Sequence, residues 1–235
     1  MVDNYLFPAR PQPTSAVVGS DSVFPVHRIF CVGRNYHAHA AEMGTSVDKA
    51  TMRPFYFNKH PAHLLASGAS IDYPPQTADY HHEVELVVAI GKPGFEVAEA
   101  ATDDLIFGYA VGLDMTRRDL QAEAKKGGRP WDLAKDFEDA AVLSAITPKS
   151  QTGLITTANI ELSVNGEIRQ KSDVSKLIWN IAEIIADLSK FYHLQPGDLI
   201  YTGTPDGVGP VVAGDRLSGK IDGVGTIELS IKEPS

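Results

Sequence analysis

The sequence predicts a single α+β domain in which short strands outnumber helices. Most of the chain after Pro54 consists of short segments that are rich in β-branched or aromatic residues and are bounded by Gly, Pro or Asn. Only two of the later segments have helical periodicity, and no repeat or Pro/Gly-rich linker divides the 235 residues into equal halves. Hydrophobic residues make up 43% of the chain, so it can bury a substantial core.

The N-terminal part of the chain precedes this strand-rich region. Residues 1–25 contain four prolines and no clear periodicity, so we expect an extended arm or a short edge strand there, ahead of a main domain at 26–235. Residues 29–32 are expected to form a buried strand, and residues 36–43 a short helix that ends at Gly44. Residues 44–54 are polar and carry no core pattern, which makes them a candidate lid loop.

The strand-rich region has a regular order of elements. Strands are expected at 55–57, 84–90, 107–114, 161–164, 199–202 and 226–231. Asn165-Gly166 predicts a tight hairpin, because a two-residue type I′ turn needs positive φ at both central residues. Helices are expected at 116–126 and at 179–191, where the apolar residues of the second recur at helical spacing.

Charge and composition exclude several classes of protein. The formal net charge is −9 and the sequence pI is near 5.3, with no basic stripe, which argues against nucleic-acid binding and against a polybasic membrane anchor. No apolar stretch is long enough to span a bilayer and no secretory signal is recognisable, so a cytoplasmic protein is expected. The single cysteine, Cys31, excludes an internal disulfide framework and a multi-cysteine metal cluster.

Three carboxylates stand out as candidate metal ligands. Glu83 and Glu85 are two residues apart on a predicted strand, so both point to one face, where a cation would offset their charges. Oxygen ligands without cysteine favour Mg²⁺, Mn²⁺ or Ca²⁺ over Zn²⁺. The alternative is that the two glutamates are solvated edge charges. Asp114 ends an apolar strand and is either a third ligand or the N-cap of the next helix.

Other polar groups suggest catalysis or anion binding. His39 and Glu42 share one face of a predicted helix, as a carboxylate-oriented general base does, or as an ordinary solvated pair does. Lys135, Arg118 and Gln121 are either surface residues or a clamp for a substrate carboxylate. The Gly-rich turn at 201–209 follows a strand and offers N–H groups and threonine hydroxyls to an anion, but lacks the Gly-Lys-Ser/Thr of a P-loop.

Several ordered motifs together resemble a known family. They are CVGRNY at 31–36, HHEVEL at 81–86, GLDMTRRDLQ at 112–121, GRPWDLAK at 128–135, VNGEIRQ at 164–170 and TGTPDGVGP at 202–210. In this order they resemble the fumarylacetoacetate hydrolase family, in particular its short acylpyruvase-like branch, over roughly residues 28–231. The resemblance implies a mixed β-roll with a small N-terminal region, a catalytic domain at 26–235, and a homodimer.

The resemblance also implies roles for individual residues. It implies one Mg²⁺ or Mn²⁺ per chain, held by Glu83, Glu85 and Asp114. It implies a water-activating dyad, His39 and Glu42, on a segment that closes as a lid, and a lysine near the metal, Lys135. The implied substrate contacts are Arg34, Arg118, Gln121 and Thr204.

Two departures from the family pattern bear on the site. An additional histidine, His60, follows Lys59 and weakens the assignment of Lys59 to the site. The stretch 136–139 is more acidic than usual and is expected to alter the preferred substrate charge.

The activity that the resemblance implies is hydrolysis of a carbon–carbon bond in a 2,4-diketo acid. Fumarylpyruvate or maleylpyruvate would give pyruvate plus fumarate or maleate, as in gentisate-type aromatic degradation. Oxaloacetate decarboxylation and general acylpyruvate hydrolysis are alternatives on the same scaffold, as is a hydratase or isomerase of 2-oxo-alkenoic acids. From a different class, the chain would be a non-catalytic keto-acid-binding protein.

Overall fold

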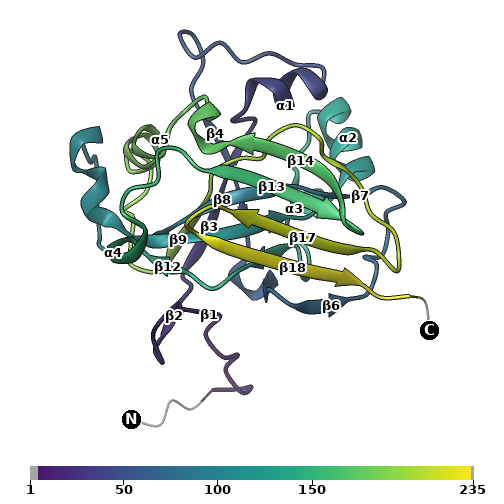
Figure 1. Cartoon of the computed structure of the whole chain (residues 1–235), viewed down its shortest axis with the longest axis horizontal. Helices are drawn as coiled ribbons and strands as arrows, with labels where there is room; N and C mark the ends of the chain where they lie inside the picture. The colour runs from purple at the N-terminus through teal and green to yellow at the C-terminus, as the bar shows by residue number, and fades with distance from the viewer. Residues whose placement is uncertain (1–4, 234–235) are drawn as a thin grey trace.

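Two large sheets make up most of the molecule (Figure 1). The computed structural model describes residues 5–233. In the larger sheet the strands lie in the order β4 (Phe55–Lys59), β3 (Arg28–Gly33), β15 (Asp198–Tyr201), β8 (Val84–Ile90), β9 (Ile106–Asp114), β11 (Ala141–Leu143) and β5 (Leu64–Ala66), and β12 (Thr147–Pro148) also pairs with β9. The second sheet has the order β14 (Glu167–Asp173), β13 (Asn159–Val164), β17 (Arg216–Ile221), β18 (Gly225–Ile231) and β6 (Ala69–Ile71).

Smaller elements surround these sheets. A three-stranded sheet contains β10 (Thr116–Arg117), β7 (Tyr80–His82) and β16 (Gly209–Pro210), and β1 (Thr14–Ala16) pairs with β2 (Val23–Pro25) near the N-terminus (Figure 1). The α-helices are α1 (His37–Glu42), α2 (Arg118–Gly127), α3 (Asp132–Lys135), α4 (Lys149–Thr152) and α5 (Ile181–Leu188). The 3₁₀ helices are η1 (Pro61–His63), η2 (Glu99–Leu105) and η3 (Val174–Lys176). Within residues 5–233, no helix has the length and apolar character needed to cross a bilayer.

The larger sheet is buried on both faces, and the alternation of its side chains determines on which face Glu85 and Asp114 lie. Val84, Leu86 and Val88 of β8 join the core between the two large sheets, whereas Val87 and Ala89 join a second cluster on the opposite face. Since side chains alternate along a strand, Glu85 belongs to the second face. Asp114 belongs to that same face of the antiparallel neighbour β9.

The register of β8 and β9 brings the acidic residues together. Val84 pairs with Leu113 and Glu85 pairs with Gly112. The backbone N–H of Asp114 donates to the carbonyl oxygen of Glu83, 2.9 Å away, so these two residues lie opposite each other just beyond the paired strands. A sheet register fixed by two hydrophobic faces therefore holds three carboxylates at one end.

The predicted α+β class and most predicted strands are confirmed, as is the hairpin, where Asn165 and Gly166 have φ of 53° and 81°. The predicted helix at 116–126 begins two residues late, at Arg118, because Thr116 and Arg117 pair with β7. The predicted helix at 179–191 is shorter, since Asn180 caps α5 through a capping box and the helix ends at Leu188. Short strands such as β6 and β11, and the longer β17, were not predicted.

The predicted loop at 44–54 follows α1 and contains no helix or strand. Gly44 has φ of 68°, a conformation that ends a helix readily. The loop contacts α5 through two ion pairs, Lys49 Nζ with Glu183 at 2.7 Å and Arg53 Nη2 with Asp187 at 3.0 Å. The division at residue 25 stays a prediction, and residues 1–4 of the predicted arm lie outside the described residues.

Truncating a core leucine tests the packing that sets this register. Leu86 is 1% exposed, so Leu86→Ala should lower the free energy of unfolding by about 2–5 kcal/mol. Leu133, which is 75% exposed, is the matched control, and Leu133→Ala should change the free energy of unfolding by less than about 0.5 kcal/mol. Denaturant unfolding of both variants measures the difference, and equal losses would contradict the assigned core.

Candidate active site

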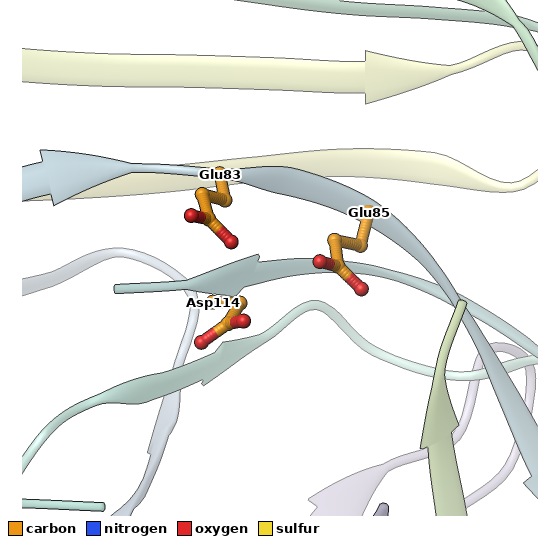
Figure 2. A group of neighbouring side chains, drawn as sticks. All are labelled: Glu83, Glu85 and Asp114. Atoms are coloured by element: carbon orange, nitrogen blue, oxygen red, sulfur yellow. The ribbon is translucent and has the colours of Figure 1, made fainter. Parts of the chain in front are cut away.

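Three buried carboxylates form the centre of the site. Glu83 and Glu85 extend from one chain segment toward Asp114 on the adjacent strand (Figure 2). One oxygen of each lies within 4.8 Å of the others, and the three residues are only 4%, 2% and 1% exposed. The alternative of solvated edge charges is therefore wrong. Asp114 is not an N-cap, because α2 begins at Arg118 with Arg117 as its cap.

Cations compensate two of these three carboxylates. Lys135 Nζ donates to Glu83 Oε2 at 2.8 Å and to Asp114 Oδ2 at 2.7 Å. Arg118 Nη2 donates to Glu83 Oε1, and Lys59 Nζ lies 2.9 Å from Asp114 Oδ1. Although burial raises the pKa of Glu83, Lys135 and Arg118 lower that pKa well below its usual range. Burial lowers the pKa of Lys135, but Asp114 and Glu83 raise it by more.

Glu85 has no such cation. Its Oε2 accepts a hydrogen bond from the backbone N–H of Gly203 at 2.7 Å, and within residues 5–233 no Lys, Arg or His forms an ion pair with it. Burial, followed by the negative charges of Asp114 and Glu83, raises the pKa of Glu85 well above its usual range. A divalent cation would supply the missing positive charge, and a donor set made only of carboxylate oxygens suits a hard ion such as Mg²⁺ or Mn²⁺. The residues present thus fit a metal.

A histidine–glutamate pair faces the carboxylates. His39 Nδ1 lies 3.2 Å from Glu42 Oε2, as the spacing on the helix predicts. His39 is 6% exposed and lines the same cavity as the three carboxylates, so it is not an ordinary surface histidine, whereas His37 on the same helix is exposed. Glu42 lies behind His39, partly exposed, and orients the imidazole.

The Gly-rich turn at 201–209 contacts both the carboxylate cluster and the His39–Glu42 pair. The N–H of Gly203 binds Glu85, and the N–H of Gly207 donates to Glu42 Oε1 at 3.1 Å. Gly207 has φ of 88°, and a Cβ there would collide with the carbonyl oxygen of Arg169, so glycine is required. The turn does offer N–H donors, as its composition predicts, but two of them are taken up here by carboxyl groups of the protein.

The remaining predicted site residues lie around one small cavity. Arg118 Nη1 donates to Gln121 Oε1 at 2.6 Å, so the two share a helix face as predicted. The hydroxyl of Thr204 donates to the carbonyl oxygen of Val84 and accepts from Gln170 Nε2, each at 2.8 Å. The cavity has a volume of about 30 Å³, and its walls include Arg34, His39, Glu83, Glu85, Asp114, Arg118, Gln121, Lys135 and Thr204.

The sequence misses three polar residues of this region. Lys59 is 1% exposed and pairs with Asp114, so the doubt that His60 cast on it is wrong. Gln170 is fully buried in the otherwise exposed start of β14, and that isolated buried position is visible only in three dimensions. Lys125 lines the cavity, and its spacing from Gln121 on the helix was the available indication.

The acidic stretch at 136–139 does not line the site. Asp136 Oδ1 accepts from the backbone N–H of His60 and lies 2.7 Å from His63 Nδ1. Glu138 and Asp139 line a separate cavity. The expectation that this stretch alters the preferred substrate charge therefore has no support from the walls of the site and stays a prediction.

The uncompensated Glu85 leads to a measurable proton linkage. Since its pKa is raised, Glu85 holds a proton above the usual range of a glutamate, and an incoming cation must displace that proton. Mn²⁺ binding should therefore release protons and weaken as the pH falls. Calorimetric titration in buffers of different ionisation enthalpy measures both effects.

Two variants complete this test of metal binding. Glu85→Gln should weaken Mn²⁺ binding at least about tenfold, because the variant lacks one carboxylate ligand. Glu123→Gln, at a side chain that is 69% exposed, should leave the binding unchanged. Binding without proton release would show that Glu85 is already ionised in the free protein.

Comparisons with known proteins agree with this geometry. The domain described as "Fumarylacetoacetate (FAA) hydrolase C-terminal" matches residues 28–232. A fumarylpyruvate hydrolase from a Ralstonia species is 57% identical over 189 residues, which cover 80% of this chain and 98% of that protein. The oxaloacetate tautomerase of Mus musculus mitochondria is 43% identical, with 87% of this chain and 91% of that protein covered.

A solved structure gives the same result. The crystal structure of fumarylpyruvate hydrolase from Pseudomonas aeruginosa in complex with Mn²⁺ and pyruvate has a TM-score of 0.93 and 46% identity, and covers 98% of this chain and all of that chain. The resemblance read from the motifs is confirmed, as is the fold that it implies. The protein belongs to the fumarylacetoacetate hydrolase family.

Proposed function

We propose that this protein is a fumarylpyruvate hydrolase, which uses water to cleave the C3–C4 bond of a 2,4-diketo acid and forms pyruvate and fumarate. The observation that carries the proposal is one cavity lined both by a carboxylate cluster that lacks a cation at Glu85 and by His39 oriented by Glu42. The Ralstonia relative of that name and the neighbour with bound Mn²⁺ and pyruvate support the substrate. Maleylpyruvate is a second substrate that the same chemistry admits.

The 2-oxo carboxylate is the end of the substrate that takes up the electron pair of the broken bond. A divalent cation, Mn²⁺ or Mg²⁺, held by Glu83, Glu85 and Asp114, supplies Lewis-acid polarisation to that end. Lys135 keeps its ammonium charge because Asp114 and Glu83 raise its pKa. Arg118 is fixed by Glu83 and Gln121. Arg118, Gln121 and Thr204 are the proposed contacts at this end, and Arg34 is a proposed contact farther along the substrate.

His39 is the proposed general base. Because a carboxylate can only accept a hydrogen bond, Nδ1 of His39 carries the hydrogen and donates it to Glu42, and Nε2 carries the free lone pair. Nε2 removes a proton from a water molecule while the water oxygen bonds to C4 of the substrate. Glu42 is a positioning residue in this step, because it acts through the imidazole.

Cleavage follows from the tetrahedral adduct at C4. When the C4 carbonyl re-forms, the C3–C4 bond breaks and its electron pair passes to the pyruvate half as an enolate. The ammonium of Lys135 stabilises that negative charge. The proton taken up by His39 then passes to C3, so one water supplies the hydroxyl of the new acid and the hydrogen of pyruvate.

Oxaloacetate chemistry is the second candidate function. The relatives named oxaloacetate tautomerases favour it, at 43% identity for the Mus musculus protein. Tautomerisation moves a proton between C3 and an enol oxygen, and decarboxylation releases CO₂; neither reaction needs an attacking water. His39→Ala should therefore abolish acylpyruvate hydrolysis, whereas a decarboxylase activity should remain.

The direct test is loss of the ultraviolet band of the enolised diketone. Fumarylpyruvate, maleylpyruvate and acetylpyruvate are each assayed with Mg²⁺, with Mn²⁺ and with EDTA, and pyruvate is measured separately. We expect metal-dependent loss with formation of pyruvate, fastest for fumarylpyruvate. Pyruvate binding to the metal-loaded protein without turnover of any acylpyruvate would instead indicate a keto-acid-binding protein.

The dyad gives a separate prediction. Glu42→Gln leaves a neutral amide beside Nδ1, so kcat should fall about 100-fold or more, with little change in KM. Glu167→Gln, at a side chain that is 69% exposed, should leave both constants unchanged. Steady-state kinetics with fumarylpyruvate decides, and an unchanged kcat in Glu42→Gln would remove Glu42 from the mechanism.

Four broader expectations belong to the same proposal. Residues 44–54 act as a lid, which is supported by the surface position of their anchors to α5, Lys49 with Glu183 and Arg53 with Asp187. Such pairs contribute only about 0–1 kcal/mol each. Residues 5–25, the described part of the predicted arm at 1–25, are an arm on the catalytic domain. The family resemblance supports a homodimer, and the bacterial relative agrees with a cytoplasmic location.

A further inference from the structure

A larger cavity adjoins the one that holds the carboxylates. The inner cavity, of about 30 Å³, has room for an ion or a water molecule but not for an organic acid. The outer cavity has a volume of about 510 Å³, and the two share Arg34, Phe57, Trp131 and Lys135 as wall residues. The part of a substrate beyond the reacting carbon therefore has space on the outer side.

The cations of this region differ in whether they are already paired. Arg118 and Lys135 donate to the carboxylates of the inner cavity. Arg34 and Lys125 also line the inner cavity, yet within residues 5–233 neither forms an ion pair or a side-chain hydrogen bond. The Nε of Arg34 is buried without a hydrogen-bond partner in this part of the chain. A buried guanidinium N–H without an acceptor is costly, so a ligand that accepts from it would be bound favourably.

Both unpaired cations lie against an aromatic pair. The guanidinium carbon of Arg34 lies 4.9 Å from the centre of the Phe55 ring, and Lys125 Nζ lies 5.2 Å from that of Trp131. The two rings contact each other edge to face, 5.5 Å apart. This places two positive charges beside an apolar wall of two aromatic rings, a combination that suits an unsaturated chain ending in a carboxylate.

The backbone holds Arg34 in place. Its φ of 52° lies in the left-handed region, which a residue with a side chain rarely adopts. The next residue, Asn35, is fully buried, and its side-chain amide donates to the carbonyl oxygens of Trp179 at 2.9 Å and Thr202 at 2.8 Å. These bonds fix the turn that presents Arg34 to the cavity.

Lys125 is positioned by helix α2. It follows Gln121 by four residues and Arg118 by seven, so all three share one helix face. Partial desolvation, followed by the positive charges of Arg118 and Arg34, lowers the pKa of Lys125 to about 8, although the charge of Glu83 acts in the opposite direction. This cluster of cations favours a bound anion.

We propose that Arg34 and Lys125 bind the distal carboxylate of a dicarboxylic acylpyruvate, and so make the enzyme select such substrates over acylpyruvates that lack this group. The inference rests on the proposed function, whose reaction it does not alter. Among the residues that line the outer cavity, Asp132 is the one acid, against Arg34, Arg129 and Lys135. The net charge of that wall therefore agrees with an anionic ligand.

Paired substrates test the proposal. Fumarylpyruvate carries the distal carboxylate and acetylpyruvate does not. Arg34→Gln and Lys125→Gln should each reduce kcat/KM for fumarylpyruvate by about 10- to 100-fold, mainly through KM, because each removes a charge-assisted hydrogen bond. For acetylpyruvate kcat/KM should stay within about twofold. Lys125→Arg, which keeps the positive charge, should retain most of the wild-type kcat/KM for fumarylpyruvate. Lys126→Gln, which removes the neighbouring charge, should leave kcat/KM unchanged for both substrates.

Two outcomes would overturn the subsite. An equal loss on both substrates would place Arg34 and Lys125 in a structural role or at the reacting end, and no loss on either would remove them from recognition. Thermal melting of each variant identifies a folding defect, and if Arg34→Gln does not fold, the Lys125 pair of variants still decides.

A binding measurement separates failure of the subsite from failure of the proposed function. Fumarate and pyruvate are titrated into the Mn²⁺-loaded wild type and into both variants. If the wild type hydrolyses no acylpyruvate but the variants bind fumarate more weakly and pyruvate equally well, the proposed function fails and the subsite stands. If the variants bind fumarate as tightly as the wild type does, or lose fumarate and pyruvate affinity together, the proposed role of Arg34 and Lys125 is wrong.

Discussion

The site depends on the burial of three carboxylates at one end of two paired strands. Glu83, Glu85 and Asp114 are almost fully buried and lie within 4.8 Å of one another, so their desolvation and mutual repulsion must be offset by opposite charge. Lys135 offsets part of this cost, but among residues 5–233 Glu85 receives only a backbone N–H. Glu85 is the carboxyl group whose charge the protein does not compensate, and a divalent cation bound there would compensate it. The unfavourable burial of charge in the metal-free site would therefore be relieved by the metal, which favours metal binding.

The two hydrophobic faces of the larger sheet determine where that cluster lies. A shift of β8 by one residue would move Glu85 into the core between the sheets and bring Leu86 to the face that carries the site. Strand β15 runs antiparallel to β8, and its Tyr201 pairs with Val87. Two residues farther along each strand, Gly203 therefore comes to lie opposite Glu85. The same pairing that builds the core therefore positions the backbone donor for Glu85.

Local patterns predicted much of this arrangement. Strand alternation placed Glu83 and Glu85 together, and helical spacing placed His39 beside Glu42. The pairing of Lys59 with Asp114 could not be predicted, because Lys59 comes from β4, more than fifty residues from Asp114 in sequence, and only the assembled sheet brings them together. The start of α2 was misplaced for a similar reason, since a tertiary strand pairing with β7 overrides the helical pattern at Thr116.

The inner and outer parts of the site follow different electrostatic rules. In the inner part, beside the three carboxylates, Lys135 and Arg118 donate to protein carboxylates, and the short helix α3 positions Lys135. In the outer part, around the rings of Phe55 and Trp131, Arg34 and Lys125 are left without carboxylate partners among residues 5–233. They come from a turn after β3 and from the surface of α2. A substitution in the outer part can thus change which acid is accepted without disturbing the charge balance on which the reaction depends. This separation agrees with a family in which two relatives, each more than 40% identical to this chain, carry the names of a hydrolase and of a tautomerase.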